Sequence, residues 1–220
     1  MITDDYRHCE TLVREADKDR FLSALFAPAT HRDALFALYA FHIEIARIPL
    51  LAHESFAAAI RLQWWRDALG GERPGEAAAH PVAAALIDAL TRAGVSPEPL
   101  IEYLDLKRAV VFGETATDSD AAIFLVAARL LGVSHDLLAP AAEHAGLAYA
   151  LALQGEAQDI ARQRYVAFRP MLDELPKAAW AAFLPAALVP LLLKWPGAPQ
   201  WRRQLTLLRT VWFGFPKTQS

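Results

Sequence analysis

The chain has 220 residues, of which 22 are Lys or Arg and 25 are Asp or Glu, so its formal net charge at pH 7 is −3. Hydrophobic residues make up 55% and charged residues 21%, a balance that excludes an intrinsically disordered chain. The slight acidity argues against a protein that binds nucleic acid. The single cysteine, Cys9, excludes an internal disulfide and a metal site of clustered thiolates.

The beginning of the chain carries Asp4 and Asp5, where a secretory signal has basic residues and then an apolar run. We therefore expect no signal peptide and a cytoplasmic location. The longest uncharged stretch, residues 178–193, is interrupted by Pro185 and Pro190. It is shorter than the roughly 20 apolar residues of a membrane-spanning helix. We interpret it as a buried core helix, and peripheral contact with an inner membrane stays open.

Composition predicts an all-α fold. Alanine, the strongest helix former, is the most frequent residue, whereas Val, Ile and Thr, which favour strands, are sparse. No long stretch alternates between apolar and polar residues, and the Asn-Gly and Asp-Gly signals of β-hairpins are absent from the sequence. No break in composition separates domains, so we expect a single helical domain over residues 1–220.

Capping residues, glycines and prolines predict where the helices begin and end. In chain order, the expected helices cover residues 3–17, 20–27, 31–48, 54–69, 81–94, 118–132 and 134–165. A further helix is expected to begin at residues 96–98. Residues 72–79 are expected to form a loop. The last third of the chain is expected to form helices broken by prolines.

The helix expected over 31–48 is apolar on every face, which is typical of the centre of a helical bundle. Its charged residues after Ala34 are Glu44 and Arg47. At this spacing they either pair with each other or with a neighbouring helix, or they line a polar pocket inside the bundle, with His42 as a further candidate. We expect Arg47 to lie in the interior, with Glu44 or Asp159 as its partner.

The next helix carries Trp64, Trp65, Arg66 and Asp67 in succession. The tryptophans either anchor the core or form the aromatic walls of a ligand site. Because neighbouring residues point about 100° apart on a helix, we expect only one ring, that of Trp64, to face a cavity. Arg66 and Asp67 are the adjoining polar candidates, and Arg47 and Arg66 could meet an anionic head group.

A third group contains Glu156, Asp159, Arg162 and Tyr165. Glu156 and Asp159 lie three residues apart, which puts two carboxylates on one helix face, and such a pair can hold Mg²⁺. The same spacing is ordinary for a solvated face on which Asp159 pairs with Arg162. Spacing favours the solvated face over a metal site at these two carboxylates.

Four motifs in order resemble the squalene/phytoene synthase family: Leu25-Phe26-Ala27-Pro28, residues 34–41, residues 60–69 and His80-Pro81-Val82-Ala83. The resemblance implies an all-α isoprenoid (terpenoid) synthase-like bundle around one central cavity. Active members of this family join two prenyl diphosphates head to head, with Mg²⁺ held by two aspartate-rich motifs. The metal neutralises the departing diphosphate, and carboxylates hold the metal.

The chain departs from this family at both metal motifs. Ile43, Ala46, Arg47 and Leu50 occupy the positions of the arginine and aspartates of the first motif. The second motif aligns with residues 155–159 and keeps one aspartate, Asp159. Loss of the first motif, together with the pattern of residues 40–46, resembles a degenerate branch of the family, the complex I assembly factors.

Beyond Tyr165 the resemblance is interrupted. Phe168-Arg169-Pro170 leads almost directly to residues 184–188, where the family has an additional long helix. The resemblance therefore implies a bundle that is truncated near its C-terminus.

Three functions remain open. The first is a non-catalytic factor of the complex I assembly type, or an isoprenoid- or lipid-binding factor, with respiratory complex subunits as partners and with neither catalytic residues nor a cofactor. The second is an active, Mg²⁺-dependent prenyltransferase that condenses two prenyl diphosphates. The third is a ligand-free helical interaction module. Two opposed clusters of carboxylates facing a cavity would favour the prenyltransferase over the non-catalytic factor. The volume of the cavity distinguishes the non-catalytic factor from the ligand-free module.

Overall fold

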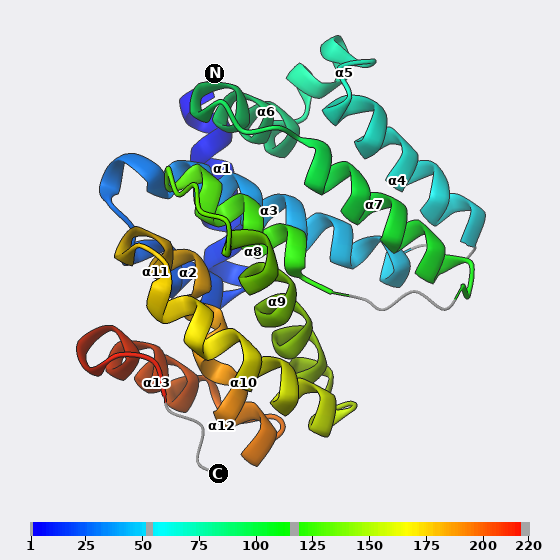
Figure 1. Ribbon diagram of the computed structural model, residues 1–220. Coiled ribbons are helices and arrows are strands. Elements are labelled where there is room, and N and C mark those ends of the chain that lie inside the picture. Colours follow the sequence, from blue (N-terminus) through cyan, green and yellow to red (C-terminus); the bar gives the residue numbers. More distant parts are fainter. Residues whose placement is uncertain (1, 52–54, 115–118, 217–220) are drawn as a thin grey trace. The chain divides into compact units, whose positions relative to one another are not determined.

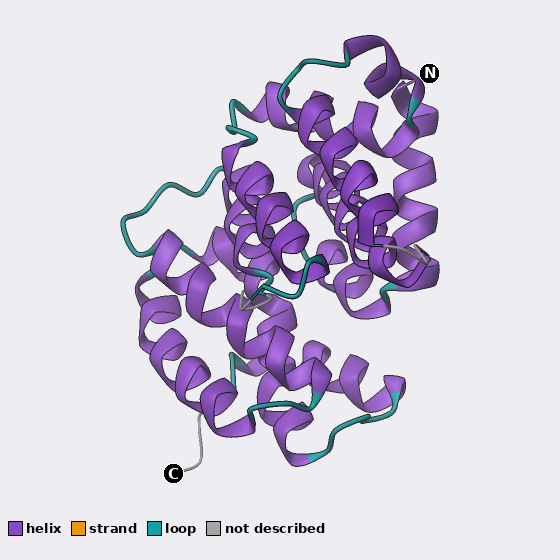
Figure 2. Cartoon of the chain, turned by 90° about the vertical axis from the view of Figure 1, so that its right-hand side faces the viewer, coloured by secondary structure: helices purple, strands orange, loops and turns teal. Residues whose placement is uncertain are grey.

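The computed structural model describes residues 2–51, 55–114 and 119–216, without the side chains of Leu50 and Leu51 (Figure 1). Figure 2 shows helices joined by turns and loops, and the described residues form no β-strand. The all-α prediction is therefore confirmed.

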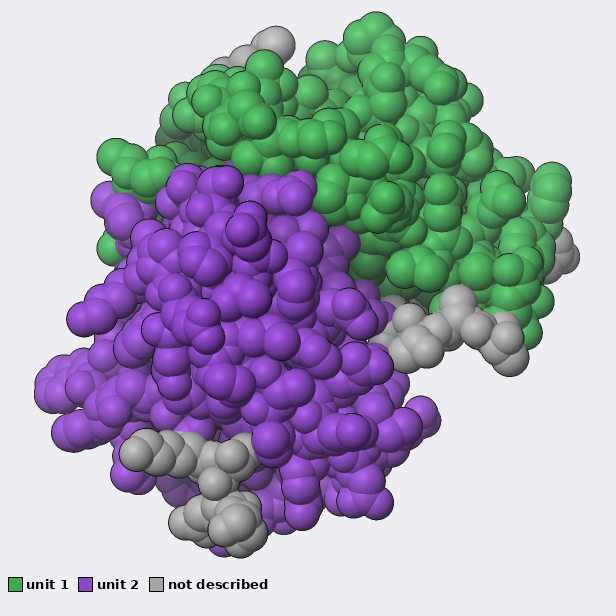
Figure 3. Space-filling model, viewed as in Figure 1, with its two compact units in different colours: residues 1–17, 30–118 green, residues 18–29, 119–220 purple. Residues whose placement is uncertain are grey.

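The chain divides into two compact units, which Figure 3 distinguishes by colour. Unit 1 comprises residues 1–17 and 30–118, and unit 2 comprises residues 18–29 and 119–220. Each unit draws on two separate stretches of chain, so neither corresponds to a continuous piece of sequence. A single domain over residues 1–220 stays a prediction.

Unit 1 contains the N-terminal helix and a group of helices from the first half of the chain: α1 (Ile2–Ala16), α3 (Ala29–Leu51), α4 (Ser55–Leu69), α5 (Pro74–Ala79), α6 (Pro81–Ala93) and α7 (Glu98–Val111). Helix α1 packs against α6, and α4 packs against α7 (Figure 1). The short α5 contacts both α4 and α6.

Helix α3 supplies much of the core of unit 1. Its residues from Leu35 to Phe41 are each at most 3% exposed, as the apolar pattern on every face predicts. Phe41 meets the ring of Trp65 on α4 edge-on, with 5.0 Å between the ring centroids. The Nδ1 atom of His42 lies 3.0 Å from the hydroxyl of Tyr103 on α7, within hydrogen-bond distance. Helix α3 is thereby fixed to both α4 and α7.

Unit 2 contains α2 (Lys18–Leu25), α8 (Ala121–Leu130), α9 (Leu138–Gln154), α10 (Gln158–Glu174), α11 (Trp180–Phe183), α12 (Val189–Lys194) and α13 (Gln200–Phe213), with the 3₁₀ helices η1 (Lys177–Ala179) and η2 (Leu184–Leu188). Helix α9 packs against α8, α10 and α12, and α13 packs against α2 and η2. In Figure 1, α9 and α10 run side by side.

The apolar stretch Lys177–Lys194 is long and apolar enough to cross a membrane, and 61% of it is buried within the structure. Phe183 and Leu188 are completely buried, so the interpretation as a core segment is confirmed for most of its length. It is not one regular helix, because Pro185 and Pro190 lie in the first turns of two separate short helices, η2 and α12. A proline has no N–H for a helical hydrogen bond and fits best in a first turn.

Three expected boundaries are wrong. Helix α3 continues past Pro49 to Leu51, because a proline removes one hydrogen bond without ending a helix whose preceding turns are packed. Residues 72–79 include the helix α5, which begins with a proline in its first turn. The helix expected over 134–165 is two helices, because Gly155 ends α9 with φ +73° and Ala157 precedes α10 with φ +41°.

Two adjacent, oppositely charged residues of α2 are buried in unit 2. Asp19 is 2% and Arg20 is 3% exposed. Arg20 forms an ion pair with the buried Asp120 before α8, and its guanidinium lies 5.2 Å from the ring centroid of Tyr149 on α9. Asp19 forms an ion pair with Arg203 and accepts a hydrogen bond of 2.8 Å from the amide of Gln200, both on α13. The sequence analysis missed this cluster.

We predict that Gly146→Ala destabilises unit 2, because α8 and α9 approach so closely that a Cβ atom at Gly146 would lie 2.3 Å from the backbone nitrogen of Ala121. Separating the two backbones should lower the free energy of unfolding by about 1–3 kcal/mol. Gly75→Ala in α5 is the control, since its Cβ meets no atom within 4 Å and alanine favours helix. Denaturation in guanidinium measures both, and an unchanged Gly146→Ala protein would contradict the close approach.

Candidate functional site

A pocket of about 330 Å³ opens in unit 1 beside α3, α4 and the start of α6. We call it the α3–α4 pocket. Its lining residues come from these three elements: Glu44, Arg47, Ile48, Arg61, Trp64, Trp65 and His80. Its volume lies at the lower end of the range for small-molecule sites, about 300–1,000 Å³.

Three aromatic rings form the apolar part of the pocket. The ring centroids of Trp64 and Trp65 are 5.2 Å apart, and that of His80 lies 5.1 Å from the first and 5.2 Å from the second. Trp65 is 4% exposed, and Trp64 is half-buried and donates a hydrogen bond of 2.7 Å to Glu76. Both tryptophans line the pocket, whereas the sequence analysis expected this of Trp64 alone.

His80 connects the rings to the charged part of the pocket. It occupies the N-cap position of α6, where its Nδ1 accepts a hydrogen bond of 3.4 Å from the backbone N–H of Ala83. An Nδ1 atom that accepts leaves the proton of a neutral imidazole on Nε2. That atom faces the carboxylate of Glu44 at 3.5 Å. Burial lowers the pKa of His80, with a smaller effect from His8, so the neutral form is favoured.

Glu44 is the carboxylate of the pocket. Burial raises its pKa from 4.5 to about 7, and the positive charge of Arg47 offsets part of that rise. Glu44 also affects Cys9 on α1. Burial is the main cause that raises the pKa of the Cys9 thiol to about 12, and the negative charge of Glu44 is the second. Cys9 is completely buried. Glu44 therefore changes its charge near neutral pH, while Cys9 stays a thiol.

Arg47 does not lie in the bundle interior. It is exposed at the pocket, so the prediction of a buried Arg47 is wrong. Helix α3 is buried from Leu35 to Ile43 and again at Ile45 and Ile48. Arg47 lies on the side of the helix that the neighbouring helices leave exposed. A long side chain on this side can keep its guanidinium in water, which avoids the cost of burying a charge.

The charges of the pocket suit an anion. The exposed Arg47 and Arg61 bring two guanidinium groups to the aromatic rings, against one carboxylate with a raised pKa. Mg²⁺ requires several oxygen ligands, and the described residues contain no group of three or more His, Cys, Asp or Glu able to hold a metal ion. The donor set does not fit the metal of the synthases, whereas an apolar ligand with an anionic group fits it.

Three further candidates in unit 1 have contacts of their own. His42 is buried beside Tyr103. Arg66 is exposed and forms an ion pair of 3.3 Å with Asp105 on α7. Asp67 accepts hydrogen bonds from Gln63 at 2.6 Å and Arg73 at 2.9 Å, which lower its pKa. None of the three is among the residues that line the pocket.

The candidates Glu156, Asp159, Arg162 and Tyr165 belong to unit 2. The first three are exposed, so the solvated face is the better description of them. Tyr165 is buried, donates a hydrogen bond of 3.3 Å to the carbonyl of Pro216, and has a pKa raised by burial.

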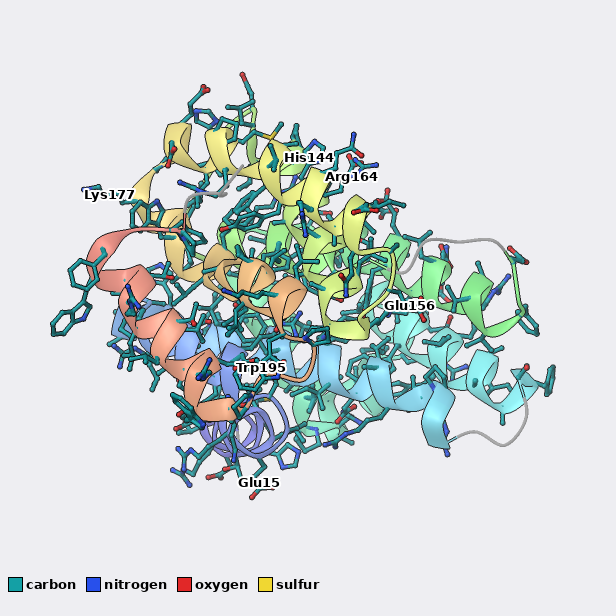
Figure 4. The ribbon with its side chains drawn as sticks, turned by 90° about the horizontal axis from the view of Figure 1, so that it is seen from below. Glu15, His144, Glu156, Arg164, Lys177 and Trp195 are labelled. Carbon is teal, nitrogen blue, oxygen red and sulfur yellow. The ribbon has the colours of Figure 1, made fainter. Side chains whose placement is uncertain are left out.

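Arg164, which directly precedes Tyr165 on α10, lies toward α9. Its guanidinium lies 3.6 Å from Glu143 and 3.4 Å from the Nδ1 atom of His144, and Figure 4 shows Arg164 beside His144. These contacts connect the two helices on the surface of unit 2.

Four lining residues were not chosen from the sequence as site candidates: Ile48, Arg61, Trp65 and His80. Arg61 and His80 are the polar ones among them. Arg61 lies one helical turn before Trp65 and therefore on the same side of α4. His80 precedes a proline at the start of a helix, a position that favours a side-chain cap. Both signals are visible in the sequence, but neither shows that the residue faces a pocket.

Comparison with known proteins identifies relatives of this chain. Residues 13–108 match the squalene/phytoene synthase family model. The family resemblance is confirmed. The matched range includes α3, α4, α6 and nearly all of α7, and therefore all residues of the α3–α4 pocket.

The chain is also similar to three curated proteins named complex I assembly factor 6 or its homolog. It is 30% identical to the Bos taurus protein over 99 residues, which is 45% of the chain and 30% of the relative. It is 26% identical to that of Rattus norvegicus over 180 residues, 77% of the chain and 54% of the relative. The homolog of Drosophila melanogaster is 37% identical over 65 residues, 29% of the chain and 19% of the relative. The matches thus span about half the relatives' length or less.

We predict that Glu44 makes unit 1 less stable as the pH rises. Its pKa is higher in the folded protein than the ordinary 4.5, so its contribution is complete below pH 4.5 and is lost as the pH approaches 7. The loss amounts to at most about 3 kcal/mol. The lowered pKa of His80 makes the folded protein less stable as the pH falls. Comparison with the Glu44→Gln variant, which keeps His80, therefore isolates the contribution of Glu44 to stability.

Melting temperatures of wild type and Glu44→Gln, measured on both sides of pH 7, test this. The variant should gain stability over wild type at high pH and match it at low pH. Glu102→Gln, at an exposed position of α7, removes the same charge and is the control. Parallel pH profiles for wild type and Glu44→Gln would show that Glu44 has no raised pKa.

Proposed function

We propose that this chain is a non-catalytic member of the squalene/phytoene synthase family that acts in the assembly of respiratory complex I. The observation that carries the proposal is the composition of the α3–α4 pocket. Where a catalytic member places the carboxylates of its first metal motif, this chain has Ala46, Arg47 and Leu50 on α3, and the pocket holds one carboxylate and two arginines.

The chemistry of a diphosphate leaving group supports the proposed absence of catalysis. Departure of a diphosphate requires neutralisation of several negative charges, which the family achieves with Mg²⁺ held by carboxylates. Glu44 is half-buried, faces His80 and has a pKa of about 7, so it is a poor ligand for a divalent cation. Two arginines can bind an anionic group, but they supply no metal and no acid for its departure.

The role in complex I assembly is supported by the names of the relatives, which are complex I assembly factors. We propose respiratory complex subunits as the partners. We further propose that the α3–α4 pocket binds an isoprenoid or lipid chain, with the chain against Trp64 and Trp65 and its anionic head at Arg47 and Arg61. A pocket of about 330 Å³ supports this function over a ligand-free module with a filled core.

The first test is turnover. Purified protein incubated with farnesyl or geranylgeranyl diphosphate and Mg²⁺ should release no more diphosphate than heat-denatured protein does. A colorimetric phosphate assay coupled to pyrophosphatase measures the release. Release that persists in wild type and disappears in Glu44→Gln or Asp159→Ala would refute the non-catalytic proposal and favour the prenyltransferase.

The second test is complementation in cells from which the gene has been removed. We expect such cells to lose assembled complex I and NADH:ubiquinone oxidoreductase activity, as measured on native gels and in membranes, and wild type to restore both. Arg47→Glu with Arg61→Glu should restore less than a tenth of the activity, because two reversed charges repel an anion and cost several kcal/mol.

Arg108→Glu, an exposed position on α7 outside the pocket, is the control and should restore complex I fully. Normal complex I in the deletion cells would refute the assembly role. Full rescue by the Arg47→Glu, Arg61→Glu variant would be compatible with a role in assembly, but it would refute the α3–α4 pocket as the site responsible for that role.

A further inference from the structure

Helix α13 in unit 2 carries an unpartnered apolar stripe. Trp201, Leu205, Leu208 and Trp212 follow one another at intervals of four, three and four residues, which is one face of a helix. They are 58%, 49%, 42% and 78% exposed, and the adjoining Phe213 is 81% exposed. Single exposed apolar residues are ordinary, but a continuous stripe with two exposed tryptophans marks an interaction surface.

The opposite face of α13 holds the helix on unit 2. Leu207 is completely buried and Thr210 is 2% exposed, and the helix packs against α2 and η2. Arg203 on the same face forms an ion pair with the buried Asp19. The stripe is therefore presented by an anchored helix, and it cannot turn inward without breaking this ion pair.

The charges that α13 itself places beside the stripe are all positive. Arg202 and Arg209 are exposed, lie seven residues apart on one flank of the stripe, and α13 contains no Asp or Glu. The guanidinium of Arg202 lies 4.5 Å from the ring centroid of Trp195 and 5.0 Å from that of Trp201. Figure 4 shows Trp195 near the N-terminal end of α13. Trp195 is 41% exposed, and Lys194 before it is exposed as well.

We infer that this surface binds the face of a lipid bilayer that carries anionic head groups, with α13 lying in the plane of the membrane interface. The α13 surface consists of Trp195, Trp201, Leu205, Leu208, Trp212 and Phe213 with Arg202 and Arg209. An amphipathic helix with tryptophans on its apolar face and arginines on its polar flank suits the boundary between acyl chains and head groups.

The chemistry favours a membrane over a protein partner. A protein interface has a polar, hydrogen-bonding rim around its apolar centre. The flanks of the stripe offer positive charge and no carboxylate from α13. Arginine side chains can extend from the depth of the indole rings to the phosphates, and attraction to an anionic leaflet increases with each of them.

Vesicle flotation tests the inference with the full chain. Binding to vesicles of an equal mixture of phosphatidylcholine and phosphatidylglycerol should be clear at low salt, weaker at high salt, and at least tenfold weaker with phosphatidylcholine alone. Trp201→Ser with Trp212→Ser should reduce binding at least tenfold, since binding scales with the buried apolar area. Arg202→Gln with Arg209→Gln should reduce it roughly fivefold for each arginine.

Matched controls lie outside the α13 surface. Phe56→Ser, 70% exposed on α4, should leave binding unchanged, as should Arg7→Gln with Arg108→Gln, which remove two exposed charges. Circular dichroism melts establish that each variant is folded. Because the substituted side chains are exposed, all melts should resemble that of wild type.

Two results would overturn the inference. The first is binding that is equal for both vesicle compositions, or that is unaffected by either α13 variant. The second is an absence of vesicle binding combined with a dimer that dissociates in the Trp201→Ser, Trp212→Ser variant during size-exclusion chromatography. That result would assign the stripe to a second copy of the chain. Both results are independent of the complex I proposal, which concerns a pocket in unit 1.

Discussion

The pair of opposite charges in α2 is the constraint on which unit 2 depends. A buried charge without a partner costs several kcal/mol, and Asp19 and Arg20 are both almost completely buried. Arg20 reaches Asp120, which lies 100 residues away in sequence, and Asp19 reaches Gln200, which lies 181 residues away. These contacts fix α2, the start of α8 and the face of α13 relative to one another. The exposed apolar stripe of α13 is a consequence, because the residues that satisfy Asp19 occupy the other face.

Unit 1 is organised by the apolar helix α3 in a comparable way. Helix α3 is nearly completely buried from Leu35 to Ile43 and polar at Glu44 and Arg47. The α3–α4 pocket lies where this change occurs. Its aromatic part is also structural, since Trp65 packs against Phe41 and His80 caps α6. The rings that could hold a ligand are thus held rigidly by the core, which lowers the entropic cost of binding.

The sequence alone predicts the parts of this structure that depend on local chemistry. Alanine content predicts the fold class, and Gly94 marks a helix end with φ +63°, as its position after α6 indicates. The break at Gly155 was missed, because Ala157, which adopts φ +41°, has no local preference for that conformation. The exposure of Arg47 was missed for a different reason. Which side of an apolar helix is left open is decided by the helices that pack on it, and their arrangement is a tertiary property.

The α3–α4 pocket lies within the residues that match the family model, but its charges differ from those of a metal site made of carboxylates. Arg47 and Arg61 give the pocket positive charge that suits an anion, and the charge of Arg47 also lowers the pKa of Glu44. Below pH 7 the protonated Glu44 leaves the positive charges of Arg47 and Arg61 unopposed, and above pH 7 its carboxylate cancels one of them. Burial lowers the pKa of His80, so protonation of this imidazole is disfavoured relative to an exposed histidine. The attraction of this pocket for an anionic group therefore weakens as the pH rises through 7, a dependence that a metal-binding pocket of carboxylates has in the opposite direction.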